Sequence, residues 1–416
     1  MISRRDFVKG GVALVSIGTT ASSLLIGTVA FAAQNPRDVA LAGTGKILVL
    51  VQLAGGNDGL NTVIPTGDAT YHSVRKEIGF KDEEILPLDS ALGLAPQLTG
   101  LKGLWDSGKL AVVRGVGYPN QNYSHFKSMA IWQAGDPELK LQDGWLGRTL
   151  DQMESQSHDP FLGFNIGAST PPELRGEKVP VPSVQDPADY GFQKNGKVVD
   201  SASDARTATL MKLYEQYPAQ SPYGVLLETT VESAVSSAQQ LAKAGGVYKP
   251  AVEYPKTSFG AGLSVLAEAI VGNLGMRVGH ITLGGFDTHS KETDDHAKLM
   301  TELDQGLTAF SNDLAKQGRA DDVLVLTWSE FGRRVQENAN GGTDHGSASI
   351  MFALGNGVKR GLYGDQPSLT KLVDNGNLSF TTDFRSVYST VIDRWLGVPS
   401  EALLGKQWGD LGFLQS

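Results

Sequence analysis

Five short stretches dominated by apolar residues predict the strands of a central sheet. The first is apolar except at Gln52, and such a run predicts a strand buried on both faces, as in a parallel sheet. The five stretches are residues 47–53, 109–116, 280–285, 322–328 and 350–354.

Apolar residues at helical spacing lie between these stretches and predict the covering layers. The segments are residues 98–105, 124–133, 262–276, 292–317 and 383–396. Ser124 is placed to cap the start of the second segment. The alternation predicts an α/β fold, a largely parallel central sheet sandwiched by helices.

Residues from about 139 to 250 interrupt this alternation. They hold six prolines between Pro160 and Pro187 and a polar segment from Lys194 to Arg206, and helical periodicity returns at 207–217 and 222–244. We therefore expect a single α/β domain over residues 33–416, with a less regular cap or insertion at about 139–250.

The first 32 residues predict an export signal. Arg4 and Arg5 precede an uncharged stretch that ends in Ala30-Phe31-Ala32, a small-x-small cleavage sequence. The arginine pair resembles a bacterial twin-arginine signal. The sequence thus predicts export by the twin-arginine translocase to the periplasm or medium, with no stable membrane span after cleavage. The alternative is an uncleaved membrane anchor.

Charge and cysteine content exclude several classes of protein. The chain carries 36 Lys and Arg against 45 Asp and Glu, a net charge of -9. Removal of residues 1–32 takes away three basic residues and one acidic residue, which leaves 33 against 44, or -11. This balance disfavours a general nucleic-acid binder. The absence of cysteine excludes disulfides, thiolate catalysis and cysteine-ligated clusters.

Polar side chains gather where four predicted strands end. Asn57 and Asp58 follow the first strand, and Ser124 and His125 lie beyond the second. The remaining candidates, which follow the strands at 280–285 and 322–328, are Asp287, His289, Glu330, Arg333 and Arg334. In an open parallel sheet the ligand crevice lies beyond the carboxyl ends of the strands, so we expect these side chains at one edge.

Carboxylate–imidazole pairs predict a metal site. Asp287 and His289 are two residues apart, which lets both face the same way in an extended segment, and Asp344 and His345 form a second pair in a Gly-rich loop. These ligands suit a divalent cation, Zn²⁺, Mn²⁺, Mg²⁺ or Ca²⁺. We expect Asp287 and His345 to lie within about 10 Å of each other if they share a metal. The alternatives are a turn-capping Asp with a surface His, and a Gly-rich hairpin.

Ser124 is the candidate nucleophile because a hydroxyl at a helix start faces unpaired N–H groups and the positive end of the helix dipole. It could equally be a plain N-cap. His125 could be a base, a ligand or a substrate contact. Asn57, Arg333 and Arg334 are candidate substrate-binding residues, although such an arginine pair often partners local carboxylates.

Several common catalytic motifs do not occur in the sequence. The loop at 55–59 is rich in glycine and follows a strand, but it matches neither the dinucleotide nor the P-loop pattern. The sequence also lacks the G-x-S-x-G motif of α/β-hydrolases.

A series of short motifs resembles an exported bacterial family of unknown function that is grouped with the alkaline phosphatase/sulfatase superfamily. In chain order these are Leu53-Ala-Gly-Gly-Asn-Asp-Gly-Leu-Asn61, Ser124-His-Phe126, Gly144-Trp-Leu-Gly-Arg148, Gly285-Phe-Asp-Thr-His289, Ser329-Glu-Phe-Gly-Arg-Arg334, Gly342-Thr-Asp-His-Gly346 and Asp383-Phe-Arg385. The resemblance covers nearly all of residues 45–400.

The resemblance implies two metal sites and a serine, threonine or modified-cysteine nucleophile, here Ser124. One site would hold Asp287, His289 and His345. The other would hold Asp58 and Glu330, where Phe331 stands in the place of a ligand histidine. The implied function is an exported metal-dependent hydrolase of phosphate or sulfate esters. The alternative is a non-catalytic binding or scaffold protein that takes a small anionic ester or a glycan. A redox protein is a third possibility.

Overall fold

The computed structural model describes residues 45–154, 161–184, 193–194, 197–198 and 248–415. Its core is a nine-stranded sheet in the order β13-β5-β12-β11-β1-β10-β6-β7, with β16 also paired to β5. The strands are β1 (Ile47–Ala54), β5 (Leu110–Gly117), β6 (Gly163–Ile166), β7 (Ser183–Val184), β10 (Val278–Gly284), β11 (Val323–Trp328), β12 (Ser349–Leu354), β13 (Gly361–Tyr363) and β16 (Thr382–Asp383).

Strand directions in this sheet are mostly parallel. β1 pairs in parallel with both β10 and β11, and β10 continues in parallel to β6 and β7. Among the described strands of the sheet, β12 alone runs against the rest, because it pairs antiparallel with both β11 and β5. The prediction of a largely parallel sheet between helices is confirmed, and each of the five predicted strands is present.

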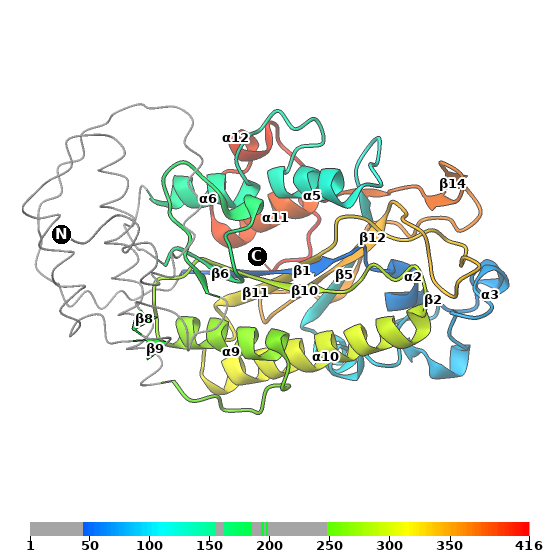
Figure 1. Ribbon diagram of the computed structural model, residues 1–416, viewed down its shortest axis with the longest axis horizontal. Coiled ribbons are helices and arrows are strands. Elements are labelled where there is room, and N and C mark those ends of the chain that lie inside the picture. Colours follow the sequence, from blue (N-terminus) through cyan, green and yellow to red (C-terminus); the bar gives the residue numbers. More distant parts are fainter. Residues whose placement is uncertain (1–44, 155–160, 185–192, 195–196, 199–247, 416) are drawn as a thin grey trace, which may run out of the picture.

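Helices cover both faces of the sheet (Figure 1). One layer contains α5 (His125–Ala134), α6 (Trp145–Glu154), α11 (Phe384–Thr390), the π-helical turn η4 (Val391–Leu396) and α12 (Glu401–Leu404). The opposite layer contains α4 (Thr99–Asp106), α9 (Ser258–Val271) and α10 (Glu292–Lys316). The five predicted helical segments of the described chain correspond to α4, α5, α9, α10 and the pair α11–η4.

The described chain also contains short helices and three small separate sheets. These elements are α2 (Gly59–Thr62), β2 (Val63–Pro65), α3 (Ala69–Val74), η1 (Asp82–Glu84), β3 (Leu86–Pro87), β4 (Leu92–Leu94), η2 (Pro172–Leu174), β8 (Gln193–Lys194), β9 (Lys197–Val198), β14 (Leu372–Val373) and β15 (Asn377–Leu378). The three sheets are β2-β4-β3, β14-β15 and β8-β9.

The two faces of β1 fill two separate hydrophobic cores. Val49 and Val51 point into the core under α9 and α10, whereas Leu48 and Leu50 point into the core under α5, α6 and α11. All four side chains are fully buried. Burial of each such side chain is worth about 1.5–3 kcal/mol relative to exposure. This two-sided burial explains why the strand is apolar throughout rather than alternating.

The segment predicted as a cap or insertion, residues 139–250, begins as part of the main fold. Its described portion supplies α6 to one helical layer and extends the sheet beyond β10 with β6 and β7. β6 has four residues and β7 has two, so neither is long enough to produce a recognisable period in the sequence. The helices predicted at 207–217 and 222–244 and the signal at 1–32 lie outside the described residues.

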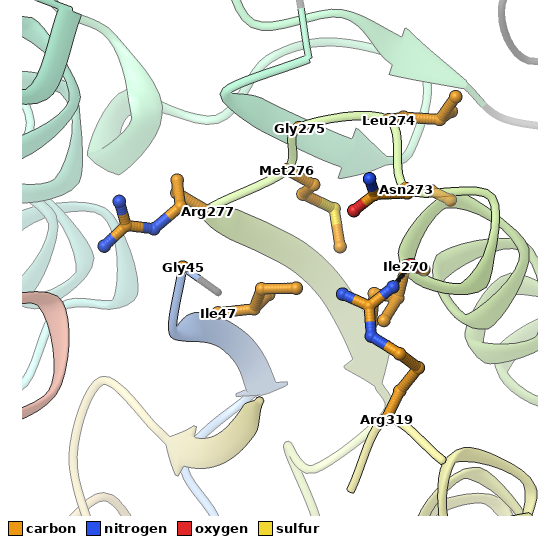
Figure 2. A pocket seen from close by; sticks show the side chains of 10 residues that line it. Gly45, Ile47, Ile270, Asn273, Leu274, Gly275, Met276, Arg277 and Arg319 are labelled. Atoms are coloured by element: carbon orange, nitrogen blue, oxygen red, sulfur yellow. Dashed lines mark hydrogen bonds between the residues drawn. The ribbon is translucent and has the colours of Figure 1, made fainter. Parts of the chain in front are cut away.

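A small pocket lies at the amino ends of β1 and β10, with Ile47, Met276 and Arg319 in its lining (Figure 2). Arg319 Nε donates to Asp322 Oδ2 over 2.7 Å, and Arg277 Nε donates to the Lys46 carbonyl over 2.7 Å. Both arginine side chains in the pocket lining are therefore already hydrogen-bonded within the protein. The pocket lies at the amino edge of the sheet, opposite to the predicted site. None of the helices in the described ranges has the length and apolarity needed to cross a membrane.

Candidate metal centre at the carboxyl edge of the sheet

Loops that follow β1, β10 and β11 meet the start of α5 and the loop before β12 at the carboxyl edge of the sheet. Asp287 and His345 are brought together there, with 3.2 Å between Oδ1 and Nε2, so their expected proximity is confirmed. The 341–346 loop does not follow a parallel strand. It reaches this edge because β12 runs in the opposite direction and therefore starts where its neighbours end.

Three side chains form a group with the spacing of metal ligands. One ligand atom each from His125, Asp287 and His345 lies within 4.8 Å of the other two. His125 Nε2 is 3.4 Å from Asp287 Oδ2, and His345 Nε2 is 3.2 Å from Asp287 Oδ1. Tetrahedral ligands at the usual ~2.0–2.1 Å from Zn²⁺ are about 3.3 Å apart, which the two imidazole–carboxylate distances of the triad approach.

Both imidazoles of the triad are oriented through their other nitrogen. His345 Nδ1 lies 2.8 Å from the Tyr123 carbonyl, and His125 Nδ1 lies 2.8 Å from Glu330 Oε1. A carbonyl can only accept, so Nδ1 of His345 carries the proton and its Nε2 presents a lone pair. Anchoring of this kind is what metal-ligating histidines show in proteins.

His289 flanks the triad on its open side. Its Nε2 is 2.9 Å from His345 Nε2 and 3.2 Å from Asp287 Oδ1, and its side chain is about half exposed. Its Nδ1 faces Asp344 Oδ1 at 3.5 Å. Asp344 thus contacts the nitrogen of His289 that faces away from the triad. The other oxygen of Asp344, Oδ2, is 3.9 Å from Arg334 Nη1.

Arg333 lies beneath the triad and is almost fully buried. Nη2 donates to Asp287 Oδ1 over 2.8 Å, and Nη1 donates to the Thr343 carbonyl over 3.0 Å. The remaining bonds of its guanidinium go to the carbonyls of Gly55, Gly56 and Phe286. These hydrogen bonds hold together the loops that carry the candidate ligands. The next residue, Arg334, has a side chain that is 41% exposed.

The charge state of the triad suits metal binding. Partial burial opposes ionisation of Asp287, but the hydrogen bond and charge of Arg333 outweigh it and lower the pKa of Asp287 to about 2. Burial lowers the pKa of His345, and the positive charge of Arg333 adds to this effect. At neutral pH the site therefore presents a carboxylate and at least one neutral imidazole, the forms that bind cations.

Glu330 is fully buried, and its partners lie around His125. Its carboxylate accepts from the Gly55 N–H over 3.0 and 3.2 Å, in addition to its contact with His125 Nδ1. A carboxylate with these contacts orients His125 from behind. In the sequence-based expectation Glu330 instead shared a second metal position with Asp58.

The carboxylate of Asp58 forms a buried ion pair with an arginine side chain. Both of its oxygens bond Arg75, one of them over 3.1 Å, and both side chains are buried. Asp58 Oδ1 also caps α2 by accepting from the Leu60 N–H over 3.1 Å. The two carboxylates expected to share a second metal position thus each have other partners in this structure. Arg75, at the end of α3, was not predicted as a site residue.

Further buried polar groups surround this ion pair. Thr343 Oγ1 donates to Glu292 Oε2 over 2.6 Å, and His296 Nε2 is 3.1 Å from Asn57 Oδ1. Burial and the nearby Asp58 charge raise the pKa of Glu292 to about 9. Burial also lowers the pKa of His296 to about 4. Asn57, a predicted substrate contact, is fully buried inside this cluster.

Close packing at the site explains the paired glycines after β1. A Cβ on Gly56, whose φ is +83°, would lie 2.3 Å from the Phe331 ring, and one on Gly55, whose φ is +125°, would lie 2.4 Å from the Asp287 backbone nitrogen. Phe331 is fully buried, with ring centroids 4.9 Å from His125 and 4.6 Å from His345. It forms the apolar wall behind the triad.

Ser124 occupies the N-cap position of α5, as predicted, but its side chain makes no capping hydrogen bond. Its N–H donates to Asn122 Oδ1 over 3.0 Å, and the residue is exposed. Its hydroxyl is therefore not used in capping, and the next residue along the chain is the candidate ligand His125.

Comparison with known proteins gives a family and a set of distant structural similarities. Residues 108–405 match the model of a family described as "Protein of unknown function (DUF1501)". No curated protein matches the chain.

Solved structures similar to this one include members of the alkaline phosphatase superfamily. A protein of that superfamily from Vibrio parahaemolyticus has a TM-score of 0.39 and 9% identity, over 89% of this chain and 71% of its own. A sulfatase from Pseudoalteromonas sp. has a TM-score of 0.38 and 10% identity, over 90% and 74%. A phosphonate monoester hydrolase from Silicibacter pomeroyi has a TM-score of 0.33 and 11% identity, over 88% and 78%. Similarities this low carry no argument about activity.

Proposed function

Since this chain belongs to the family of proteins of unknown function named DUF1501, whose description assigns no activity, we propose its function from the geometry of the site: it is a hydrolase of phosphate or sulfate esters that depends on one divalent cation. A single observation carries the proposal. Two imidazoles, each anchored through Nδ1, direct Nε2 toward the carboxylate of Asp287 at 3.4 and 3.2 Å.

The donor set fits Zn²⁺ best among the cations considered. His125 and His345 supply nitrogen and Asp287 supplies oxygen, whereas Mg²⁺ and Ca²⁺ prefer oxygen ligands alone. Three protein ligands leave a position for water or substrate, with His289 close enough to serve as a fourth ligand. Bound there, Zn²⁺ would polarise an ester oxygen and acidify water.

Ser124 is the proposed nucleophile. It is exposed at the first turn of α5, where unpaired N–H groups and the helix dipole favour a negatively charged oxygen. Its attack on the ester's phosphorus or sulfur would release the alcohol and leave a covalent ester on Ser124, which water then hydrolyses. The exposed guanidinium of Arg334 is the candidate contact for the substrate anion.

A non-catalytic binding protein is the second candidate, and two observations favour it. The Phe331 ring packs against His125, and Arg75 pairs with Asp58, so one residue expected to bind a second cation is already paired with a guanidinium. A single cation site could then retain a small anionic ester or a glycan without turning it over.

The decisive experiment uses the protein purified after export and freed of metal. Zn²⁺ binding is measured by calorimetry, and turnover is measured on phosphate mono- and diesters and sulfate esters with Zn²⁺, Mn²⁺, Mg²⁺ or Ca²⁺. His345→Ala should lose both metal and turnover. Ser124→Ala should keep the metal and lose turnover, whereas the exposed Ser90→Ala should change neither.

Each outcome of this experiment separates the candidates. Turnover that survives Ser124→Ala removes the serine mechanism. Zn²⁺ binding without turnover on any ester favours the binding protein. A wild-type protein that binds no divalent cation contradicts both the metal site and the hydrolase.

Export belongs to the same proposal because a periplasmic or secreted hydrolase needs a signal. Arg4 and Arg5 with the Ala30-Phe31-Ala32 sequence lead us to expect a mature protein that begins at Ala33. Intact-mass measurement of the exported protein tests the cleavage site. Replacement of both arginines by lysine should keep the precursor in the cytoplasm, and unchanged export would rule out the twin-arginine route.

A further inference from the structure

Phe126 is unusually exposed for a large apolar side chain. Its exposed fraction is 86%, whereas the other exposed large hydrophobic residues of the described chain, Leu139, Leu372 and Val373, reach 40% at most. Single exposed apolar residues are common in proteins, so exposure alone assigns no role. The position of Phe126 provides the second observation.

Phe126 is the second residue of α5, directly after the candidate ligand His125. Side chains on a helix lean toward its N-terminus. The N-terminus of α5 is where His125 meets Asp287 and Glu330, so Phe126 lies at the same end of the helix as the metal site. The flanking residues Ser124 and Lys127 are also exposed, which leaves this turn open to a ligand.

We propose that Phe126 is the recognition surface for the alcohol part of the substrate, and that this alcohol carries a ring with an apolar face, such as an aryl group or a pyranose. This inference rests on the proposed function, since it assumes that the anionic part of the ligand binds at the cation. An aromatic ring at this end of α5 favours such a group because paired rings attract each other beyond the effect of the area they bury.

Charge supports a ligand that is anionic at one end and apolar at the other. The cation site and the exposed Lys127 and Arg334 supply positive charge, and Phe126 supplies an uncharged face. A small inorganic anion would use the first feature and leave the ring in water. An ester of a ring-bearing alcohol uses both.

The test compares phenylphosphonate with methylphosphonate, which carry the same anion but differ in the ring. Binding to the Zn²⁺-loaded mature protein is measured by calorimetry. We expect phenylphosphonate to bind about tenfold more tightly to the wild type, equivalent to ~1.4 kcal/mol. Phe126→Ala should abolish the difference without changing Zn²⁺ binding, and Phe126→Tyr should retain it. Leu372→Ala, a matched loss of an exposed apolar side chain, should leave the difference intact.

Three results would overturn the proposal. They are equal affinities in the wild type, a preference that persists in Phe126→Ala, and the binding of neither phosphonate. A preference for the ring in a protein without ester turnover would keep the recognition surface and reject the hydrolase. Cosedimentation with phosphatidylcholine vesicles that is lost in Phe126→Ala, together with equal phosphonate affinities, would assign Phe126 to membrane contact instead.

Discussion

Two neighbouring groups of polar residues use the same side-chain types for different ends. The open group, His125, Asp287, His289 and His345, is partly exposed and places three imidazole nitrogens within 3.4 Å of one carboxylate. The closed group, Asp58, Arg75, Glu292 and His296, is buried. In the closed group the carboxylate of Asp58 already forms an ion pair with the guanidinium of Arg75.

The difference teaches that a carboxylate at the right sheet edge is not sufficient for a metal site. Asp58 follows β1 as Asp287 follows β10, yet Arg75, directly after α3, bonds both oxygens of Asp58. Asp287 also meets an arginine, but Arg333 bonds only Oδ1, and Oδ2 remains directed toward His125. What separates the two groups is whether the partner arginine leaves a ligand atom free.

Removal of the buried positive charge of Arg75 should have the largest effect on stability. Arg75→Met leaves Asp58 charged and unpaired in the interior, and breaking a buried pair in this way costs about 3–5 kcal/mol. Arg334→Met is the matched control because its contact with Asp344 is long and exposed, worth about 0–1 kcal/mol. Urea unfolding of both variants measures the difference. A loss below about 1 kcal/mol in Arg75→Met would mean that the closed group does not hold a charged pair.

Removal of the negative charge of Glu330, which contacts His125, should have an intermediate effect. We expect it to weaken metal binding. Glu330→Gln can still accept the Gly55 N–H but no longer holds His125 Nδ1 by charge. Changes to such outer partners typically weaken metal binding 10–100-fold. Calorimetric Zn²⁺ titration measures it, with unfolding in urea as the check on folding. Abolition of binding would instead assign Glu330 as a direct ligand.

The third expected effect is a change in the pH dependence of stability. The pKa of Glu292 is about 9 in the folded protein against an ordinary value of 4.5, so between these values the folded state holds a proton that the unfolded state has lost. Stability from this group therefore falls as pH rises from about 5 to 9, by at most about 1.4 kcal/mol per pH unit.

Glu292→Gln should flatten this dependence, because an amide can still accept from Thr343 and does not titrate. Urea unfolding at pH 6, 7, 8 and 9 compares the slopes of the variant and the wild type. Equal slopes would show that Glu292 is ionised in the folded protein throughout this range.

The five main strands were predictable because burial on both faces requires an unbroken run of apolar residues. The polar residues that follow these strands could be identified in the same way. The proximity of Asp287 and His345 was predicted from parallel strands, although the loop of His345 in fact precedes an antiparallel strand. Strand direction could not be predicted because residues 349–354 are buried in either orientation.

The roles of the arginines were not predictable from their neighbours in the sequence. Arg333 and Arg334 are adjacent, yet one is buried against five backbone and side-chain acceptors and the other is exposed. Arg75 lies in a polar stretch without a motif, and its partner is 17 residues away. Such pairings depend on tertiary contacts that local spacing does not encode.

The bonds of Arg333 also constrain the order in which the protein can fold. Arg333 reaches the Gly56 carbonyl across 277 positions of the chain and Asp287 across 46. Contacts of such long sequence separation form slowly, because the entropy of closing the intervening loop is lost before they contribute. A nascent chain that ends before residue 345 cannot complete the triad, since His345 has not yet been added. Capture of a cation would therefore follow the docking of β1, β10 and β11, and metal occupancy would report that these strands have docked.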